Sequence, residues 1–561
     1  MNLLLVASAA LALLAPLQAT PVINVDTKTG DTITGQKTFS VTVSSGDVIN
    51  SVEFYVNDDL QDTQTSTPYT FQLDTVGQSD GPIKVSFKAY TSQNKTATKV
   101  LNLTIDNQKS KGADFHVTAG QSDLADGKFQ AAVDEGRIAL SIDATSNGAR
   151  YILARANLEL KVFDKAQKYA EDAVAQDPKD DQAYQVLSAI DAHRGFSTIA
   201  KEGSDRAEVI ASIGDAFKGA VEARQKSLDI EMSQLAAPTP ANATSEADMA
   251  LRAGRYSLVI NSLAPMMLQD NKNVAIAKRL AFAQLRAGRL RDSLQTLTDL
   301  KMYTTPDAYC FALMALVYTE LNQDDQATDA IKTAVESDPD DTGVRTAQAF
   351  IALKRNKTNV LAGLTNDLAQ DQAQSPLVSY FLMALADRQQ RFGDARRYFE
   401  RSVLAEPANA EPYVEQANYD VGLSLNTKLE KTEKAYLLQE AKMYFQTALI
   451  ARPESVEGLA GVAMIDMLQN HVTEAVQYAE AARDASPTEA LGHYAAAGAY
   501  QMKAAVTTGK EQDGFLTKTQ EESKLAAQLD QSHLLGVGSP TGKALWTYLN
   551  TAGRTAVVSY P

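Results

Sequence analysis

The residues best able to do chemistry are few and scattered along this sequence of 561 residues. The single cysteine, Cys310, lies in the apolar run Tyr309-Cys310-Phe311-Ala312-Leu313, which favours a small buried side chain over a nucleophile. The histidines have no metal-ligand partner at close spacing; they are His116, His193, His471, His493 and His533. The sequence therefore predicts no metal site and no cofactor.

Catalytic motifs are missing as well. The sequence holds no glycine-rich phosphate loop, no Gly-x-Ser-x-Gly elbow, no His-Glu-x-x-His and no paired cysteines. Aspartate clusters at 177–181 and 338–341 look superficially like calcium loops, but they lack the glycine and the terminal glutamate of an EF-hand. Their recurrence at predicted helix junctions favours helix capping. We therefore predict no catalytic residues and a non-enzymatic protein.

Composition and charge exclude several classes of partner. With 44% hydrophobic and 22% charged residues, the chain has the composition of a folded protein, and its length requires several domains or a repeat array. The net charge of −16 argues against nucleic acid and against docking on anionic lipid, because both need clustered lysine and arginine.

The first residues have the pattern of an export signal. Residues 3–14 form an apolar run, Pro16 breaks it, and Leu17-Gln18-Ala19 offers a cleavage site. A short membrane anchor is the alternative, but the run is shorter than the ~20 residues that a span needs. We expect a signal peptide over 1–19 and an exported protein, located in the periplasm, at the cell surface or outside the cell. No membrane span is expected after signal removal, and a single cysteine leaves no internal disulfide.

Residues 20–107 alternate between apolar and polar side chains with period two, as in Phe39-Ser40-Val41-Thr42-Val43 and over residues 83–90. About seven short strands with turns between them predict an antiparallel β-sandwich. The stretches at 52–58 and 68–74 resemble bacterial immunoglobulin-like domains of cell-surface proteins, which are mostly spacers or adhesion modules. Three aromatic residues, Tyr55, Tyr69 and Phe71, are either core or surface side chains, and core positions are favoured.

After a polar linker at 108–113 the period becomes helical, and a repeat register follows from aligned prolines. One repeat length separates Pro453 from Pro487, and alanines recur at fixed distances before Pro178, Pro339 and Pro487. A period near 34 with this alanine and aromatic spacing resembles the tetratricopeptide repeat (TPR), in which each unit is a pair of antiparallel helices. The resemblance covers roughly 114–535 and about ten units. The fold class is therefore multidomain, an all-β immunoglobulin-like sandwich followed by an all-α superhelical solenoid.

The repeat register is lost between His193 and Ser245, which divides the helical region. We expect a first sub-array with an atypical helix over 114–235, a linker over 236–245 and the main array over 246–535. Residues 536–561 are expected to form a C-terminal cap and tail, because a terminal repeat otherwise exposes its apolar face.

The resemblance to TPR proteins implies a concave groove that holds a peptide or a partner's helix. The register places an aromatic stripe on the inner helices, and a partner would contact it through stacking and hydroxyl groups. The alternative is that these side chains pack between adjacent repeats. The predicted partner-binding residues are Tyr151, Phe282, Tyr309, Phe350, Tyr380, Tyr413 and Tyr494.

These observations favour an exported scaffold that binds a protein or peptide in the groove of the solenoid. A cell-surface adhesion or carbohydrate-binding protein, acting on a cell-envelope glycan through the β-sandwich, is the alternative.

Overall fold

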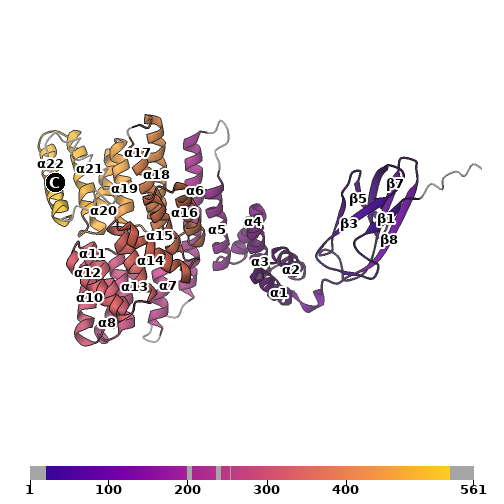
Figure 1. The fold of residues 1–561 in the computed structure, drawn as a ribbon, viewed down its shortest axis with the longest axis horizontal. Coiled ribbons are helices and arrows are strands. Elements are labelled where there is room, and N and C mark those ends of the chain that lie inside the picture. Colours follow the sequence, from indigo (N-terminus) through magenta and orange to yellow (C-terminus); the bar gives the residue numbers. More distant parts are fainter. Residues whose placement is uncertain (1–19, 199–204, 235–241, 253, 427, 531–561) are drawn as a thin grey trace, which may run out of the picture. The chain divides into compact units, whose positions relative to one another are not determined.

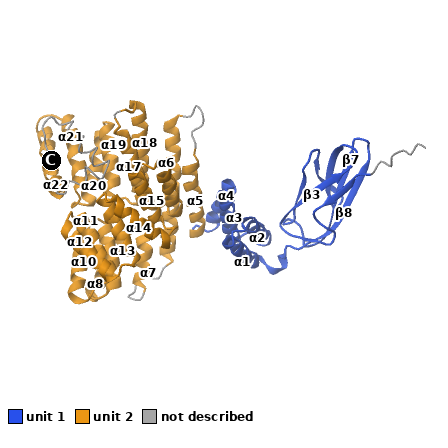
Figure 2. Ribbon diagram, in the orientation of Figure 1, with its two compact units in different colours: residues 1–178 blue, residues 179–561 orange. Residues whose placement is uncertain are grey.

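The computed structural model describes residues 20–198, 205–234, 242–252, 254–426 and 428–530 (Figure 1). The predicted signal peptide, most of the predicted linker at 236–245 and the predicted cap at 536–561 lie outside the described residues. The chain divides into two compact units, residues 1–178 and residues 179–561 (Figure 2).

The first unit begins with the predicted β-sandwich. One sheet has the strand order β1-β3-β6 and the other has the order β2-β8-β7-β4-β5. All strand pairs are antiparallel except β2 with β8. The strands are β1 (Val22–Val25), β2 (Thr32–Ile33), β3 (Gln36–Ser44), β4 (Ile49–Val56), β5 (Asp59–Gln64), β6 (Tyr69–Asp74), β7 (Gly81–Thr91) and β8 (Thr96–Ile105).

The sandwich core is built from the inward positions of the alternating strands. Phe39, Phe54, Phe71 and Phe87 are at most 1% exposed, and their ring centroids lie 5.2–5.6 Å apart. Such offset and tilted ring pairs stabilise a core beyond the burial of their area.

Two of the three aromatics predicted to be core are core, and one is not. Tyr69 and Phe71 are 5% and 0% exposed. Tyr55 lies between the inward Phe54 and Val56, so strand alternation turns it to the outer face of the sheet. There its hydroxyl donates a 2.5 Å hydrogen bond to Glu53, and the prediction of a core position for Tyr55 was wrong.

Four helices complete the first unit: α1 (Ala113–Ala125), α2 (Phe129–Ile142), α3 (Asn147–Glu159) and α4 (Phe163–Gln176). Consecutive helices pack in pairs, α1 with α2 and α3 with α4. The alanines that set the register before Pro178 are fully buried, namely Ala154, Ala166, Ala170 and Ala173. Small side chains at these positions let the helix axes approach closely.

The second unit contains the remaining described helices. Two of them, α5 (Asp181–Ser197) and the long α6 (Arg206–Ser233), precede eight consecutive helix pairs. These pairs are formed by α7 (Ala243–Arg252), α8 (Tyr256–Gln269), α9 (Val274–Arg286), α10 (Leu290–Tyr303), α11 (Ala308–Glu320), α12 (Asp324–Ser337), α13 (Thr342–Lys354), α14 (Thr358–Asp371), α15 (Pro376–Arg388), α16 (Phe392–Ala405), α17 (Ala410–Ser424), α18 (Lys431–Ala451), α19 (Val456–Leu468), α20 (Val472–Ala485), α21 (Ala490–Ala505) and α22 (Lys510–Leu529).

In the five pairs from α7–α8 to α15–α16, the turn between the two helices recurs at the interval of the repeat. A left-handed backbone conformation, with φ between 51° and 70°, recurs once per repeat at Gly254, Gly288, Asn322, Asn356 and Gln390. Glycine and asparagine adopt this conformation at the lowest cost, so the predicted glycine turns at 254 and 288 are confirmed.

The aspartate clusters cap helices as predicted. The carboxylates of Asp180 and Asp341 each accept a 2.9 Å hydrogen bond from the backbone N–H of the third residue after them, at the starts of α5 and α13. Each carboxylate thereby satisfies one of the N–H groups that the first turn of a helix leaves unpaired.

Turns of the early pairs contact the ends of much later helices. A Cβ atom added to Gly288 would lie 2.8 Å from the carbonyl oxygen of Ala485, at the end of α20. The side-chain amide of Asn322 donates a 2.7 Å hydrogen bond to the carbonyl of Leu529, at the end of α22. Segments far apart in the sequence therefore touch, and the array winds back onto itself.

Helix α6 also joins distant sequence. Its Phe217 is 1% exposed and lies among the rings of Phe399, Tyr413 and Tyr444, with centroids 5.7–6.2 Å away. The amide of Gln225 donates to the carbonyls of Ile450 and Ala451 at the end of α18. Helices α5 and α6, which fall in the predicted segment 114–235, thus share a hydrophobic core with α16 to α18.

Cys310 is fully buried in α11, as predicted, and burial raises the pKa of its thiol to about 12. A thiol that is protonated and enclosed is a packing group, because only the thiolate is an effective nucleophile.

Candidate functional site: the inner helices of the array

The predicted aromatic stripe divides into two groups by exposure. Tyr380, Tyr413 and Tyr494 are 8%, 0% and 4% exposed, so little or none of each ring faces solvent. The hydroxyl of Tyr413 donates a 3.2 Å hydrogen bond to the carbonyl of Pro407, within the core shared with α6. Tyr494 packs against the alanines of α21 and α22. In these positions the rings fill space between neighbouring helices.

The other four residues are half-buried: Tyr151, Phe282, Tyr309 and Phe350. Tyr151 belongs to the first unit and packs beside Ala132, Ile152 and Ala156. Phe350 stacks edge-on against Phe381, with centroids 4.9 Å apart. Burial, followed by the neighbouring carboxylate of Asp341, raises the pKa of Tyr309. These rings keep some surface available, and the contact of all seven aromatics with a partner stays a prediction.

Charged side chains on the same helices form a second series, which the sequence reasoning missed. Arg286, Glu320, Lys354 and Arg388 are the last residues of α9, α11, α13 and α15. They follow the same interval as the turns, so each occupies an equivalent place in its pair. A register built on alanine, aromatic and proline positions does not include charges. Tabulating charge at the same interval would have found this series.

These charges pair with residues of later helices. The guanidinium of Arg286 donates to Glu411 at the start of α17, although the two residues are 125 positions apart. Arg452 reaches the same carboxylate at 3.2 Å and approaches Glu457 at 3.4 Å. Burial opposes ionisation of Glu411, but the two arginines outweigh it and lower its pKa to about 2. Glu411 therefore stays a carboxylate between two guanidinium groups.

Lys354 is the most open member of the series. Its side chain is 46% exposed and its ammonium group contacts Glu320 of the preceding pair. Burial lowers the pKa of this lysine, whereas the carboxylates of Glu320, Glu489 and Glu457 raise it, and the net shift is upward. Burial and the neighbouring Glu457 carboxylate raise the pKa of Glu489. Acids from α19 and from the start of α21 therefore interact electrostatically with the ammonium group of α13.

The inner helices thus present charges of both signs beside half-buried aromatic rings. Arg388, the last member of the series, makes a 2.8 Å ion pair with Glu415 of α17. Such a surface offers both donors and carboxylates to an extended polypeptide, whose backbone and side chains need both. Among the described residues, no group of three or more histidine, cysteine, aspartate or glutamate side chains could hold a metal ion.

Comparison with known families agrees with this architecture in both parts of the chain. Residues 21–127 match the model of the bacterial Ig domain, and residues 250–317 match a model of the tetratricopeptide repeat. The chain combines a bacterial immunoglobulin domain with tetratricopeptide repeats. The predicted fold class is confirmed. No curated protein is similar enough in sequence to match the chain.

Several solved structures resemble parts of this TPR protein. The fibronectin(III)-like modules of CbhA from Clostridium thermocellum are 23% identical, with 15% of this chain and 97% of that one covered and a TM-score of 0.14. Yeast Tom70 is 13% identical, with 76% of this chain and 97% of that one covered and a TM-score of 0.28. A tetratricopeptide repeat protein from Parabacteroides merdae is 15% identical, with 47% of this chain and 99% of that one covered and a TM-score of 0.32.

TPR solenoids generally serve in protein interaction and not in catalysis, which is the function class that the repeats support here. In the part of the chain that the structure describes, no helix combines the length and the apolar character needed to cross a bilayer.

Proposed function

We propose that this TPR protein is an exported, non-enzymatic scaffold that binds a protein or peptide partner in the concave groove of its helical array. The observation that carries the proposal is the series of evenly spaced charged helix ends, which opposes carboxylates of later helices. Lys354 and Glu457 are 46% and 36% exposed, so a ligand reaches them without unfolding the array. The apolar run and cleavage pattern within residues 1–19 support export.

The partner that fits this surface is a polar segment with charges of both signs. An apolar peptide would remove the charges of Lys354 and Glu457 from water without replacing their hydration, which is costly. A segment with its own acidic and basic side chains exchanges one set of ion pairs for another. Among the predicted aromatics, the half-buried Tyr309 and Phe350 are the rings that such a segment contacts most directly.

Affinity capture from a cell-envelope extract, followed by mass spectrometry, tests the proposal with the chain from residue 20 onward as bait. We expect Lys354→Glu and Glu457→Lys each to reduce capture of the same partner. Lys332→Glu is the matched control, because Lys332 lies on α12, the second helix of its pair, and its side chain is 71% exposed. If both charge-reversal variants capture as much partner as the wild type does, groove binding is refuted. Circular dichroism like that of the wild type shows that the variants are folded.

A second candidate function rests on the outer face of the five-stranded sheet. Tyr55 and Tyr90 are half-buried there, and the Lys88 ammonium lies 4.9 Å from the centroid of the Tyr90 ring. Outward aromatic rings beside polar groups suit stacking on a sugar ring, so this face supports the carbohydrate-binding alternative. Co-sedimentation of the full chain with insoluble envelope polysaccharide tests it. Loss of co-sedimentation in Tyr55→Ala with Tyr90→Ala would favour this candidate, and unchanged sedimentation would exclude this face.

A further inference from the structure

A pocket of about 280 Å³ lies in the second unit between α6 and the helices α15 to α18. Its apolar walls come mainly from α6 and α18, with Ile210 and Leu437 buried. Three acidic side chains line it, Asp387 from α15, Asp420 from α17 and Glu440 from α18. The lining also includes the cationic Arg396 and three aromatic side chains, namely Phe392, Tyr419 and Tyr444.

Asp420 is the unusual member of this set. It is 4% exposed, and its Oδ1 atom accepts a 3.2 Å hydrogen bond from the side-chain amide of Gln416. Its buried Oδ2 atom has no hydrogen-bond partner among the described residues. Buried carboxylate oxygens are normally satisfied, and leaving one unpaired costs free energy. Asp420 lines the pocket, and its unpaired Oδ2 atom points to a donor supplied from outside the described residues.

The groups around Asp420 set its charge. Burial raises the pKa of Asp420 well above its usual range, and the carboxylate of Glu440 raises it further, whereas Gln416 and Arg396 act in the opposite direction. Asp387 also raises it. Each of these carboxylates therefore makes ionisation of Asp420 less favourable. An added cation reduces this repulsion.

Two arginines near the pocket, Arg396 and Arg206, also contact groups other than Asp420. The Arg396 guanidinium lies 5.7 Å from the centroid of the Phe196 ring. Arg206 makes its shorter contact, 2.7 Å, with Glu433 and reaches Glu440 at 3.4 Å. Neither arginine supplies a donor to the Oδ2 atom of Asp420.

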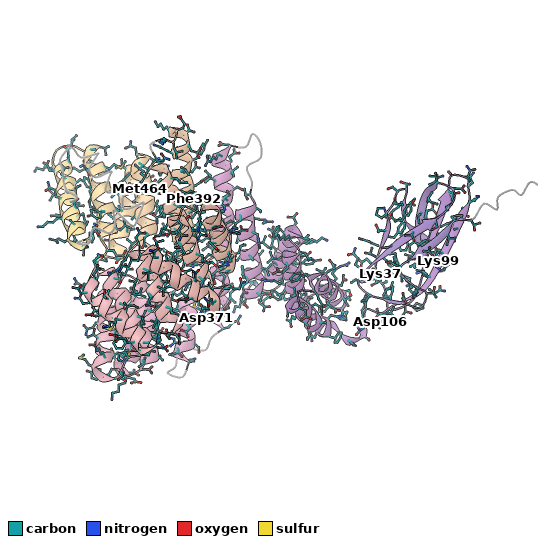
Figure 3. All side chains as sticks on the ribbon, in the orientation of Figure 1. Lys37, Lys99, Asp106, Asp371, Phe392 and Met464 are labelled. Atoms are coloured by element: carbon teal, nitrogen blue, oxygen red, sulfur yellow. The ribbon has the colours of Figure 1, made fainter. Side chains whose placement is uncertain are left out.

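The volume of the pocket suits a ligand of side-chain size. Phe392, labelled in Figure 3, is 46% exposed, and its ring lies 5.3 Å from that of Tyr419. The volume is close to the lower end of the ~300–1,000 Å³ typical of small-molecule sites. Aromatic rings in the lining favour a cation, because their faces carry negative potential.

We propose that this pocket binds the ammonium group of an alkylamine of about lysine side-chain length, with Asp420 as its main acceptor. The carboxylates of Glu440 and Asp387 add long-range attraction, and the rings of Phe392 and Tyr419 cover the alkyl part. The ammonium comes either from a lysine side chain of a polypeptide or from a free small amine. No member of the charged series is among the lining residues, so the amine site does not rest on the groove proposal.

Isothermal titration of the chain from residue 20 onward tests the proposal with two amines and their neutral counterparts. The amines are n-pentylamine and Nα-acetyl-lysine N-methylamide, and the counterparts are 1-pentanol and Nα-acetyl-norleucine N-methylamide. We expect saturable binding of the amines at millimolar concentration and none of the neutral molecules. Equal affinity for both amines identifies a free-amine site, and tighter binding of the lysine derivative identifies a polypeptide side chain.

Two substitutions locate the site. Asp420→Asn keeps the shape and removes the charge, and we expect binding at least about tenfold weaker, as for loss of a buried charged acceptor. Its thermal melt should not fall, because the substitution removes a carboxyl group whose ionisation is opposed by burial. Glu440→Gln should weaken binding to a smaller extent. Asp394→Asn is the matched control, since Asp394 lies on α16, pairs with Arg391 and Arg397 and is not among the lining residues.

The pH dependence provides a readout that a merely structural aspartate would not give. Burial and the Glu415 carboxylate raise the pKa of Asp387 to about 7, while Arg388 opposes them. Both Asp387 and Asp420 therefore gain charge as the pH rises, while the amine stays protonated, and affinity should increase from about pH 6 to about pH 8 with proton release. Absence of amine binding, or equal binding by wild type and Asp420→Asn, would overturn the proposal.

Discussion

Replacing Phe217 by alanine should destabilise the second unit strongly, because this side chain holds α6 in the core of the later helices. Phe217 is 1% exposed, and its ring centroid lies 5.0 Å from that of Phe196 and 5.7 Å from that of Tyr413. A buried Phe→Ala change costs about 3–5 kcal/mol, and each lost ring pair contributes about 0.5–1.5 kcal/mol of that cost. The site collapses poorly, since the neighbouring rings belong to four different helices. We expect a loss of about 3–5 kcal/mol.

Urea denaturation followed by circular dichroism measures this loss, and hydrogen exchange locates it. Unfolding of a two-unit chain is not a single two-state transition, so exchange of the amides in α6 and α18 is the decisive measurement. Both helices should lose protection together. Tyr303→Ala is the control, because Tyr303 is 51% exposed and its removal should change stability by at most about 0.5 kcal/mol. If α6 alone exchanges faster while α18 is unchanged, the shared core has been misassigned.

Three further predictions concern the repeat register and its charges. Ala463→Leu should cost about 1–3 kcal/mol in denaturant melts, because Ala463 is fully buried between helices. Gly288→Ala should be destabilising by about 1 kcal/mol or more, since φ is +70° and the added Cβ meets Ala485, whereas Gly363→Ala in open helical surface should be neutral or stabilising in the same melts. Glu411 has a pKa lowered to about 2, so its contribution is complete above about pH 4.5 and is lost as the pH falls towards 2; Glu411→Gln should flatten the acid limb of the stability curve.

Local patterns were enough to predict most of the architecture. Period-two alternation predicted the sandwich, and the repeated interval of proline, alanine and glycine predicted the paired helices and their turns. Both signals arise within one repeat or one strand, where backbone geometry and nearest neighbours decide the structure. Tyr55 shows the limit of this reasoning even in a strand. Its burial was judged from its residue type, whereas its position between two inward residues decided the outcome.

The contacts that join distant repeats could not be predicted in this way. Phe217 contacts Tyr413 because curvature accumulates over several helix pairs. A periodic sequence pattern describes one repeat and does not give the total curvature. The pocket around Asp420 has the same origin, since its lining comes from α6 and from helices much later in the sequence. Sequence alone also left the aromatic stripe with two interpretations. Side-chain exposure in the structure separates Tyr413, which is inaccessible, from Tyr309 and Phe350, which are partly open.

Under the proposed function, the charged inner series connects stability with binding. Arg286 neutralises Glu411 although the two lie 125 positions apart, so this ion pair helps to fix how tightly the array is wound. Under the proposed function, a partner with charges of both signs competes for the same groups, and each ion pair that it replaces is lost to the array. The pairs most easily exchanged are those with the most exposed members, Lys354 and Glu457, because solvent already screens them. Under the proposed function, a partner would therefore replace the outermost ion pairs and leave the enclosed Arg286–Glu411 contact in place.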